Sequence, residues 1–159
     1  MIWKLLILYQ IKHFLCDYPL QGQYMLGKFK KFPDFILPLF SHALVHGMAT
    51  YYIALEVTHK PNSAFLLGLL DLAVHFTVDR IKASPSLLGR FKALSGKEYF
   101  NLVQPKLSPD DMSDEQRARH EERKTQLFRS NKFFWWSLGL DQGLHHLTHY
   151  FIIYMLLKG

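Results

Sequence analysis

Histidine and aspartate recur at four-residue steps in this chain of 159 residues. The clearest example is DLAVHFTVD, in which Asp71, His75 and Asp79 follow one another at that spacing. On an α-helix, four residues advance the side chain by about 40° around the axis, so the three groups share one face. Imidazoles and carboxylates that share a face can ligate a metal ion or pass protons along the helix. Either chemistry needs further groups from other segments.

Three other apolar segments carry the same spacing, which makes six such pairs in the chain. Chance pairing of 9 His and 8 Asp residues would give about two. The remaining pairs are His13–Asp17, His42–His46, Asp141–His145 and His145–His149. From the depth of each residue in its segment, we expect the groups to meet at one level, with Asp17 and His149 at its margins.

The elements that would position these groups are four uninterrupted apolar windows, at about residues 2–18, 36–57, 64–83 and 133–157. Each window has about 17 to 25 residues, which at 1.5 Å per residue approximates the hydrocarbon thickness of a bilayer. The predicted fold class is therefore all-α, a four-helix transmembrane bundle. A soluble bundle of buried helices is the alternative, because the first and third windows are short and interrupted by charge.

Basic residues predict how such a bundle would be oriented in a lipid bilayer. The segment from Arg80 to Lys132 carries 12 basic and seven acidic residues, a net charge of +5, and three more lysines lie in the first connection. The positive-inside rule then places both connections in the cytoplasm and both termini outside. We therefore expect one membrane domain over residues 1–159, with residues 84–132 as a charged cytoplasmic helical insert.

The insert has a helix start, with Ser108 or Ser113 as its N-cap and acids in the first turn. Its positive charge is not accompanied by a groove-reading or RNA-binding motif. We therefore expect anionic lipid headgroups, and no nucleic acid, as its partner.

Four carboxylates inside a bilayer need compensating charge, because each costs about 2.5 to 3.5 kcal/mol near the bilayer centre. Two divalent metal ions would match the four negative charges. Mixed imidazole and carboxylate ligation favours Zn, with Mn, Fe or Co as further options. A proton relay, or polar packing without metal, stays open as an alternative. The predicted ligands are His13, Asp17, His42, His46, Asp71, His75, Asp79, Asp141, His145 and His149.

Four stretches of the chain resemble the domain of unknown function 3307, a family of small membrane proteins of bacteria and their phages. They are HFLCDYPLQGQYM from His13, SHALVHG from Ser41, DLAVHFTVDRIKA from Asp71 and LDQGLHHLTHY from Leu140. The resemblance covers all four windows but not the insert. It implies a helical membrane architecture and a bacterial inner-membrane location, without an activity. The His and Asp layout is also similar, more distantly, to membrane-bound metal-dependent hydrolases.

The ligand set leads to a functional hypothesis: a membrane-embedded, dinuclear metal-dependent hydrolase that acts on a phosphate ester of a lipid or lipid-linked substrate. Asp17 or His149, if outside the metal shell, would serve as general base. Lys12, Arg80 and Lys82 are expected near the cytoplasmic mouth, where they could hold a lipid phosphate.

Two other functions remain open at this point. Histidine-rich membrane oxygenases use four-residue His pairs around two irons, although four aspartates favour hydrolytic ions over iron. Alternatively, the metal only staples a non-catalytic bundle, and the basic insert binds a partner. Exposed four-helix units often associate, so a homo-oligomer is also among the expected partners.

Overall fold

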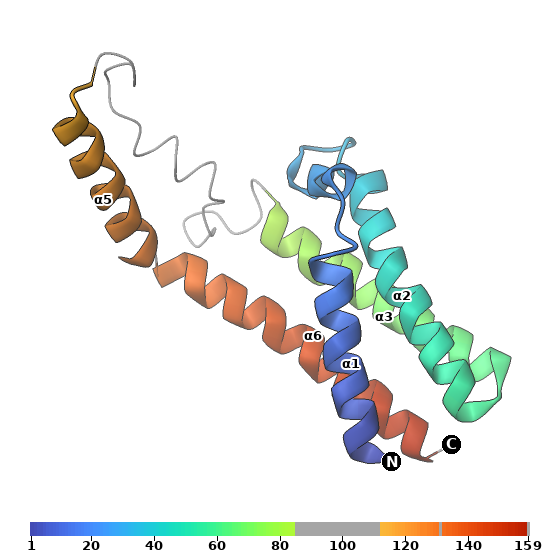
Figure 1. Cartoon of the computed structure of the whole chain (residues 1–159). Coiled ribbons are helices and arrows are strands. Elements are labelled where there is room, and N and C mark those ends of the chain that lie inside the picture. The colour runs from blue at the N-terminus through green and yellow to red at the C-terminus, as the bar shows by residue number, and fades with distance from the viewer. Residues whose placement is uncertain (85–111, 131, 159) are drawn as a thin grey trace.

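The computed structural model describes residues 1–84, 112–130 and 132–158, and all regular structure within them is helical. Five elements are α-helices and one is a 3-10 helix (Figure 1). The all-α prediction is confirmed for this part of the chain. In chain order the elements are α1 (Ile2–Asp17), η1 (Gln23–Phe29), α2 (Ile36–Thr58), α3 (Pro61–Ala83), α5 (Asp114–Ser130) and α6 (Lys132–Lys158).

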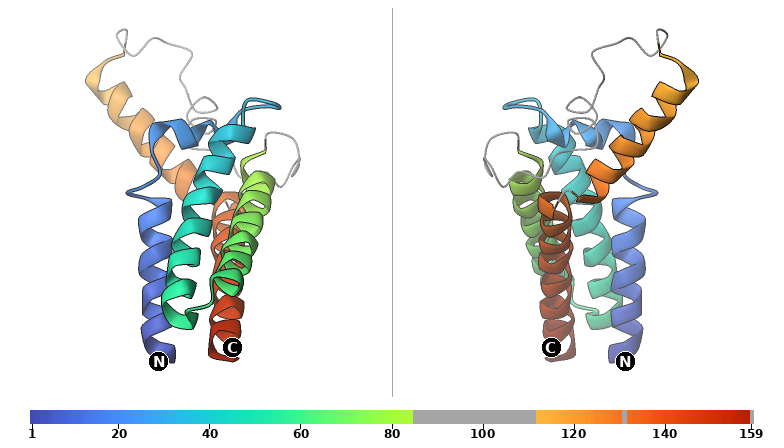
Figure 2. Two further views of the ribbon diagram at one scale, coloured as in Figure 1. Left: turned by 90° about the vertical axis from the view of Figure 1, so that its right-hand side faces the viewer. Right: turned by 90° about the vertical axis from the view of Figure 1, so that its left-hand side faces the viewer.

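Four of these helices form a bundle. α1 packs against α2 and α6, and α3 packs against the same two helices, so the four close into a ring. The two termini and the α2–α3 turn lie at one end of the bundle, which we name the terminal end (Figures 1 and 2). The 3-10 helix η1 and the last turn of α3 lie at the other end, which we name the cap end. This arrangement turns one face of each helix toward a shared interior.

The helices begin and end within three residues of the ranges predicted from the sequence. The largest difference is at the start of α3, where Pro61 lies in the first turn. Proline fits there because an N–H at that position would have no partner within the helix. α2 ends where His59 adopts a left-handed conformation with φ of 53°, and the His59 N–H donates to the carbonyl of Leu55 at 2.8 Å. Only His59 and Lys60 therefore separate α2 from α3.

Two glycines allow α2 and α3 to approach each other closely. A Cβ atom at Gly68 would lie 2.7 Å from the carbonyl oxygen of Gly47, and one at Gly47 would lie 2.8 Å from the carbonyl oxygen of Gly68. Both distances are shorter than a van der Waals contact, so any side chain at either position would push the helices apart. The glycines thus hold His46, next to Gly47, against His75 on α3.

The terminal half of the bundle has an apolar interior. Buried side chains from all four helices meet there and exclude water, which stabilises the fold by roughly 25 cal/mol per Å² of buried apolar surface. We name this cluster the apolar core. It consists of Leu5, Tyr9, Ala54, Ala64, Ile152, Ile153 and Leu156.

None of the described helices combines the length and the apolar character that a membrane span requires. The transmembrane part of the fold prediction, and the multi-pass location that depends on it, are therefore not confirmed. α1 has 16 residues, and α3 carries four charged side chains among its apolar ones. Two of those charged residues, Asp71 and Asp79, are themselves candidate ligands, so the site lowers the mean hydropathy of the helix that carries it.

The described part of the predicted insert 84–132 is mainly the helix α5. Ser113 is its N-cap, because Ser113 Oγ accepts a hydrogen bond from the Gln116 N–H at 3.3 Å while Gln116 Oε1 accepts one from the Ser113 N–H at 2.9 Å. This reciprocal capping box selects Ser113 from the two predicted N-caps. Ser108 and the rest of residues 85–111 lie outside the described residues. α5 lies beyond the start of α6, away from the other bundle helices (Figure 1).

Candidate metal centre

The ten predicted ligands lie together in the interior of the bundle, in its cap half. Two come from α1, two from α2, three from α3 and three from α6. Nine of the ten expose 4% of their surface or less, and the side chain of Asp17 exposes 16%. Whether these residues bind metal stays a prediction, but the four segments do bring them to one place.

The four-residue spacing explains why the groups face inward. Steps of three or four residues return to the same side of an α-helix, so a residue at each turn points to the interior. The buried positions of α3 follow this rule as Ala64, Gly68, Asp71, His75, Asp79 and Ala83. On α6 the rule gives Asp141, His145 and His149, followed by Ile152 and Leu156 of the apolar core.

Six of the ligands form one set, which we name the histidine-rich group. Their ligand atoms make three overlapping triplets, and the atoms of each triplet lie within 4.8 Å of one another. The rings of His46 and His75 stack with their centroids 3.7 Å apart, and His46 Nε2 lies 3.0 Å from Asp17 Oδ1. The group consists of His13, Asp17, His46, Asp71, His75 and His149.

Three other ligands form a second set, the carboxylate group, which consists of Asp79, Asp141 and His145. Their ligand atoms also lie within 4.8 Å of one another. His145 Nε2 is 3.3 Å from Asp79 Oδ1 and 3.6 Å from Asp141 Oδ1. Two carboxylates and one imidazole at this separation could share one divalent ion.

Two histidines join the groups. His42 Nε2 lies 3.4 Å from Asp17 Oδ1 in the first group and 3.2 Å from Asp79 Oδ2 in the second. The His75 ring stacks on the His145 ring with centroids 3.9 Å apart, and on its other neighbour His46 as described above. The interior therefore offers ligands for two neighbouring ions.

Three lysines supply positive charge to this interior, which the spacing of His and Asp does not predict. The pairs, with their Nζ–Oδ2 distances, are Lys12–Asp71 at 2.5 Å, Lys28–Asp79 at 2.6 Å and Lys82–Asp141 at 2.5 Å. Of the four carboxylates, Asp17 has contacts with histidines but none of these lysine partners. With neutral imidazoles, four aspartates and three lysines leave a net charge of −1.

Lys12 lies inside the bundle, and its predicted place at the mouth is wrong. It exposes 5% of its surface, and its Nζ is also 3.3 Å from both His46 Nδ1 and His149 Nε2. Its position three residues after the buried Tyr9 places it on the inner face of α1, and this spacing was the signal available in the sequence. A buried ammonium needs an acidic partner, because an unpaired charge in the interior is very costly.

Arg80 and Lys82 are at the cap end, but only one of the two contacts a candidate ligand. The Arg80 guanidinium carbon lies 3.4 Å from the centroid of the Phe35 ring, and its Nη1 donates to the carbonyl of Lys30 at 3.3 Å. Lys82 pairs with Asp141 while 30% of its side chain stays exposed. Lys82 is thus the one of this pair that could meet both a ligand residue and an arriving molecule.

Further polar residues hold the ligands in place and were absent from the predicted set. Thr50 Oγ1 donates to Asp71 Oδ2 at 2.6 Å, and Gln142 Nε2 donates to Asp141 Oδ2 at 3.1 Å. Lys28 also donates to Gln21 Oε1 at 3.0 Å. Thr50 stands four residues after His46, so the spacing rule extended to threonine would have found it. The spacing rule does not find Gln142 or Lys28. Gln142 directly follows the ligand Asp141 in sequence, and Lys28 lies in η1, outside the four bundle helices.

The family described as Protein of unknown function (DUF3307) matches residues 5–106. The chain belongs to this family. The match includes α2, α3 and nearly all of α1, with the seven candidate ligands that these helices carry, and it ends before α6. The resemblance seen in the sequence extends to LDQGLHHLTHY of α6, which lies outside the match, whereas the match reaches into the insert. No curated protein and no solved structure matches the chain.

The candidate ligands contain most of the buried atoms that lack a hydrogen-bond partner. Among the described residues nine such side-chain atoms occur, and eight of them belong to seven of the ligands. Each buried polar atom without a hydrogen-bond partner costs about 1 to 3 kcal/mol, so such a cluster favours a bound species that accepts lone pairs. A neutral imidazole offers one lone pair, so the two nitrogens of His42 count as a single ligand atom. Some of the eight have an ion-pair contact nearby: His42 Nε2 lies 3.4 and 3.2 Å from Asp17 and Asp79, and Asp71 Oδ1 lies 3.1 Å from His75 Nδ1. The eight atoms are His13 Nδ1, His42 Nδ1 and Nε2, Asp71 Oδ1, His75 Nε2, Asp141 Oδ1, His145 Nδ1 and His149 Nδ1.

Proposed function

We propose that this chain is a membrane-embedded, metal-dependent hydrolase that binds two divalent ions, Zn by preference, and acts on a phosphate ester of a lipid or lipid-linked molecule. The observation that carries the proposal is the cluster of eight unpaired nitrogen and oxygen atoms on buried imidazoles and carboxylates. These atom types are the ones that Zn, Mn, Fe and Co accept as ligands. In an apolar or purely structural interior such atoms would be paired with each other or replaced.

The two groups divide the ligands between two ions. His46, Asp71 and His75 would hold one ion, and Asp79, Asp141 and His145 would hold the other, since each triplet brings its ligand atoms within 4.8 Å. The remaining ligands, His13, Asp17, His42 and His149, would complete or orient these two sets. When bound, a pair of divalent ions lowers the pKa of a coordinated water and neutralises the oxygens of a phosphoryl group.

The charge balance favours an anionic substrate. With neutral imidazoles, as metal ligation requires, the four aspartates and three lysines sum to −1, and two divalent ions raise this to +3. A phosphate monoester carries a charge of about −2 at neutral pH. Such a substrate would bring the buried charge close to zero, whereas a neutral ester or amide would leave the excess positive charge uncompensated.

Asp17 is the residue best placed to act as general base. Its carboxylate has no lysine partner, it exposes more of its surface than the other ligands, and His13 and His46 hold it in position at 3.2 and 3.0 Å. A carboxylate so held can accept a proton from an arriving water without first breaking an ion pair. His149, the other predicted base, is 1% exposed and lies 3.3 Å from the Lys12 ammonium, which makes it the weaker candidate.

The outer surface of the bundle supports placement in a lipid bilayer. Large apolar side chains are exposed on every bundle helix, among them Ile7 at 60%, Leu37 at 67%, Leu66 at 64% and Leu147 at 63%, while the cap half of the interior is ionic. Proteins in water have the opposite arrangement, since their charged groups face the solvent. Mean hydropathy averages the apolar outer face with the ionic inner face, so it understates how the helix meets its surroundings.

The helix lengths and charges are compatible with this placement. α2 and α3 have 23 residues each and α6 has 27, which is about 35 to 40 Å at 1.5 Å per residue and exceeds a hydrocarbon core of about 30 Å. α1, with 16 residues, is about 24 Å long and would need a locally thinner bilayer. Among the described residues, Lys28, Lys30, Lys31, Arg80 and Lys82 lie at the cap end and Lys4, Lys60 and Lys158 at the terminal end. The positive-inside rule would therefore turn the cap end to the cytoplasm and both termini to the other side of a bacterial inner membrane.

Elemental analysis of detergent-purified protein tests the proposal, with two adjacent histidines as matched variants. His145 is a member of the carboxylate group, whereas His146 is half-buried and contacts Gln10 at 3.4 Å. We expect about two ions per chain in the wild type and in His146→Ala, a lower content in His145→Ala, and release of inorganic phosphate from a lipid phosphate monoester only when metal is bound. Wild-type protein that stays free of metal after supplementation with Zn and Mn would refute the metal centre.

A second candidate is a non-catalytic bundle whose polar interior only stabilises the fold. The three lysine pairs favour it, because they neutralise three of the four carboxylates without metal. In that case chelators would leave the free energy of unfolding unchanged and no phosphate ester would be hydrolysed. Metal content without turnover on any lipid phosphate would instead support the metal-stapled form of this candidate, with the basic insert as the partner surface.

A further inference from the structure

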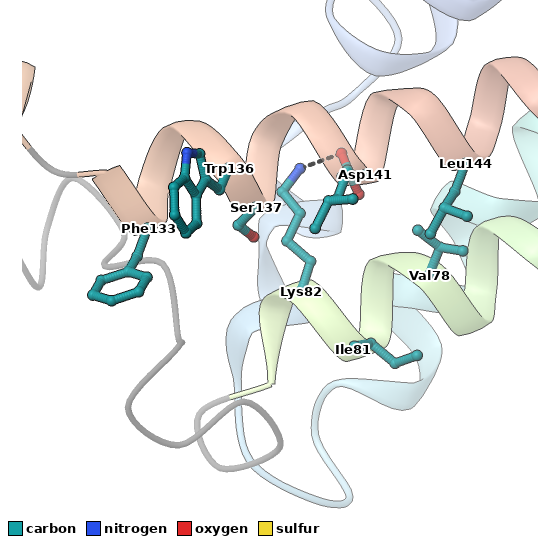
Figure 3. Close-up of a pocket in the computed structure, with 9 residues that line it drawn as sticks. Val78, Ile81, Lys82, Phe133, Trp136, Ser137, Asp141 and Leu144 are labelled. Carbon is teal, nitrogen blue, oxygen red and sulfur yellow. Dashed lines mark hydrogen bonds and ion pairs between the residues drawn. The ribbon is translucent and has the colours of Figure 1, made fainter.

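An apolar groove opens between α3 and α6 beside the carboxylate group, with a volume of about 330 Å³ (Figure 3). This volume lies at the low end for ligand-binding pockets, so the groove suits one hydrocarbon chain better than a bulky headgroup. Three polar residues, Lys82, Ser137 and Asp141, also line it. The apolar walls are formed by Val78, Ile81, Phe133, Trp136, Leu140 and Leu144.

The Lys82–Asp141 ion pair links this groove to the carboxylate group, because Asp141 belongs to that group and also lines the groove. Lys82 extends from α3 across the groove to Asp141 on α6, and Nζ meets Oδ2 at 2.5 Å (Figure 3). The other oxygen of Asp141, Oδ1, is buried without a hydrogen-bond partner and faces His145 at 3.6 Å. One carboxylate therefore has an oxygen toward the groove cation and an oxygen toward the carboxylate group.

We infer that the groove is the binding site for the hydrocarbon chain of a membrane lipid that carries a terminal phosphate monoester, and that Lys82 receives the phosphate. This inference rests on the proposed function and names the substrate class and its route to the site. Two observations select this occupant: six of the nine lining residues are apolar, and the cation that lines the groove with them is of the kind that binds phosphate as a point charge. A water-soluble phosphate ester would match the lysine but would leave the walls without a partner.

Binding would change the partner of Lys82. In the structure its ammonium is held by Asp141, and a phosphate that enters the groove offers oxygens of higher negative charge. The ammonium then moves to the phosphate, and Asp141 Oδ2 is released to join Oδ1 at the carboxylate group. Arrival of the lipid phosphate and completion of the Asp79–Asp141–His145 ligand set are thus coupled through one side chain, with no covalent step.

The test uses the full chain in detergent with a chelator present, so that binding is measured without turnover. Trp136 lines the groove, and the chain has two other tryptophans, Trp3 and Trp135. In the Trp3→Phe/Trp135→Phe background, the fluorescence of Trp136 is recorded while bromododecyl phosphate is added, because bromine quenches indole only at contact distance. Bromododecanol and inorganic phosphate are the matched probes that lack the phosphate or the chain.

We expect bromododecyl phosphate to quench Trp136 at concentrations at which bromododecanol does not. Lys82→Met should weaken this binding about tenfold to a hundredfold, the range for one charge-assisted contact. Lys31→Met should not change it, since Lys31 is an exposed lysine near the same end of the bundle. Leu144→Trp, which fills the groove, should abolish the binding of labelled dodecyl phosphate in an equilibrium-dialysis assay, which does not depend on the added tryptophan.

Equal quenching by bromododecanol and bromododecyl phosphate, or an unchanged affinity in Lys82→Met, would overturn the inference. A third result would also overturn it: bromododecyl phosphate does not quench Trp136, and the protein is a dimer that Leu140→Glu dissociates. The groove would then be a contact between two copies of the chain. The outcomes separate this inference from the proposed function. Lipid phosphate binding without hydrolysis leaves the groove site standing and rejects the hydrolase, whereas hydrolysis unaffected by Lys82→Met does the reverse.

Discussion

The two halves of the bundle are built from the same four helices, yet their interiors are opposite in polarity. On α6 the inner face carries His145 and His149 and, one turn later, Ile152 and Leu156. On α1 the change falls between Tyr9 and Lys12. The spacing of buried residues is the same on both sides of this boundary. Helix geometry thus decides which positions are buried, and residue type alone decides what burial does to stability and chemistry.

The two interiors differ in how they respond to the loss of one side chain. In the apolar core each residue contributes through the area it removes from water, and its truncation leaves a cavity but no buried charge without a partner. In the cap half each charged group depends on a partner, so the loss of one member leaves the other buried and unpaired. Substitutions in the first interior should lower stability only, whereas those in the second should lower both stability and metal content.

The largest effect is expected from Asp71→Ala, which breaks the ion pair with Lys12. Removing one partner of a buried pair costs about 3 to 5 kcal/mol in unfolding free energy. Lys12 would be left with two histidines, which supply no negative charge. Denaturant titration of the detergent-solubilised protein, followed by circular dichroism, measures the loss.

The double variant Lys12→Met/Asp71→Ala provides the control for this prediction. It removes both charges and replaces the lysine stem with an apolar chain of similar length, so it should recover much of the stability lost in Asp71→Ala. A double variant as unstable as the single one would show that the pair is not the source of the effect. The candidate ligand Asp71 would be missing in both, so metal content should be low in both.

A core truncation of comparable size gives the contrast. Ile152 is fully buried in the apolar core, and Ile152→Ala should lower the unfolding free energy by about 3 kcal/mol because it leaves a cavity. Metal content should stay at the wild-type value, since the nearest ligand on the same helix, His149, keeps its position. Leu147→Ala is the control, because Leu147 lies on the outer face of α6 and exposes 63% of its surface. A loss of metal in Ile152→Ala would mean that the two halves are not independent.

Much of the fold and of the candidate site could be predicted from the sequence, because helix periodicity shows in the spacing of residues a few positions apart. The helical segments, and the ten His and Asp residues that meet in the interior, follow from it. The register of α2 against α3 does not, since it depends on Gly47 and Gly68 meeting across the interface. The source of compensating charge was also out of reach, because the partners of Lys12 and Lys28 lie 59 and 51 residues away in the chain.

Removal of metal should also distinguish the two halves of the bundle by their effect on stability. A ligand present at one hundred times its dissociation constant stabilises the folded state by about 2.7 kcal/mol. Chelation should therefore lower the unfolding free energy by that amount for each ion removed. The loss should be the same in the wild type and in Ile152→Ala, and smaller in His75→Ala, which keeps the ligands of one ion only. Unfolding measured with and without chelator gives the three differences. Equal differences in all three proteins would mean that the chelator acts elsewhere than at the histidine-rich group.

The smallest effect, and the sharpest probe of the boundary, is expected at Thr50. Thr50 Oγ1 donates to Asp71 Oδ2 at 2.6 Å, where the ionic interior begins, whereas Thr77 Oγ1 on α3 is exposed and donates to its own helix at the Ala73 carbonyl. The substitution Thr→Val keeps the shape and removes the hydroxyl in both cases. Thr50→Val should cost about 1.5 kcal/mol, the value for a hydrogen bond to a charged group, and Thr77→Val less than about 0.5 kcal/mol. If the two variants lost equal amounts of unfolding free energy, the hydrogen bond from Thr50 to Asp71 would not contribute to the stability of the ionic interior.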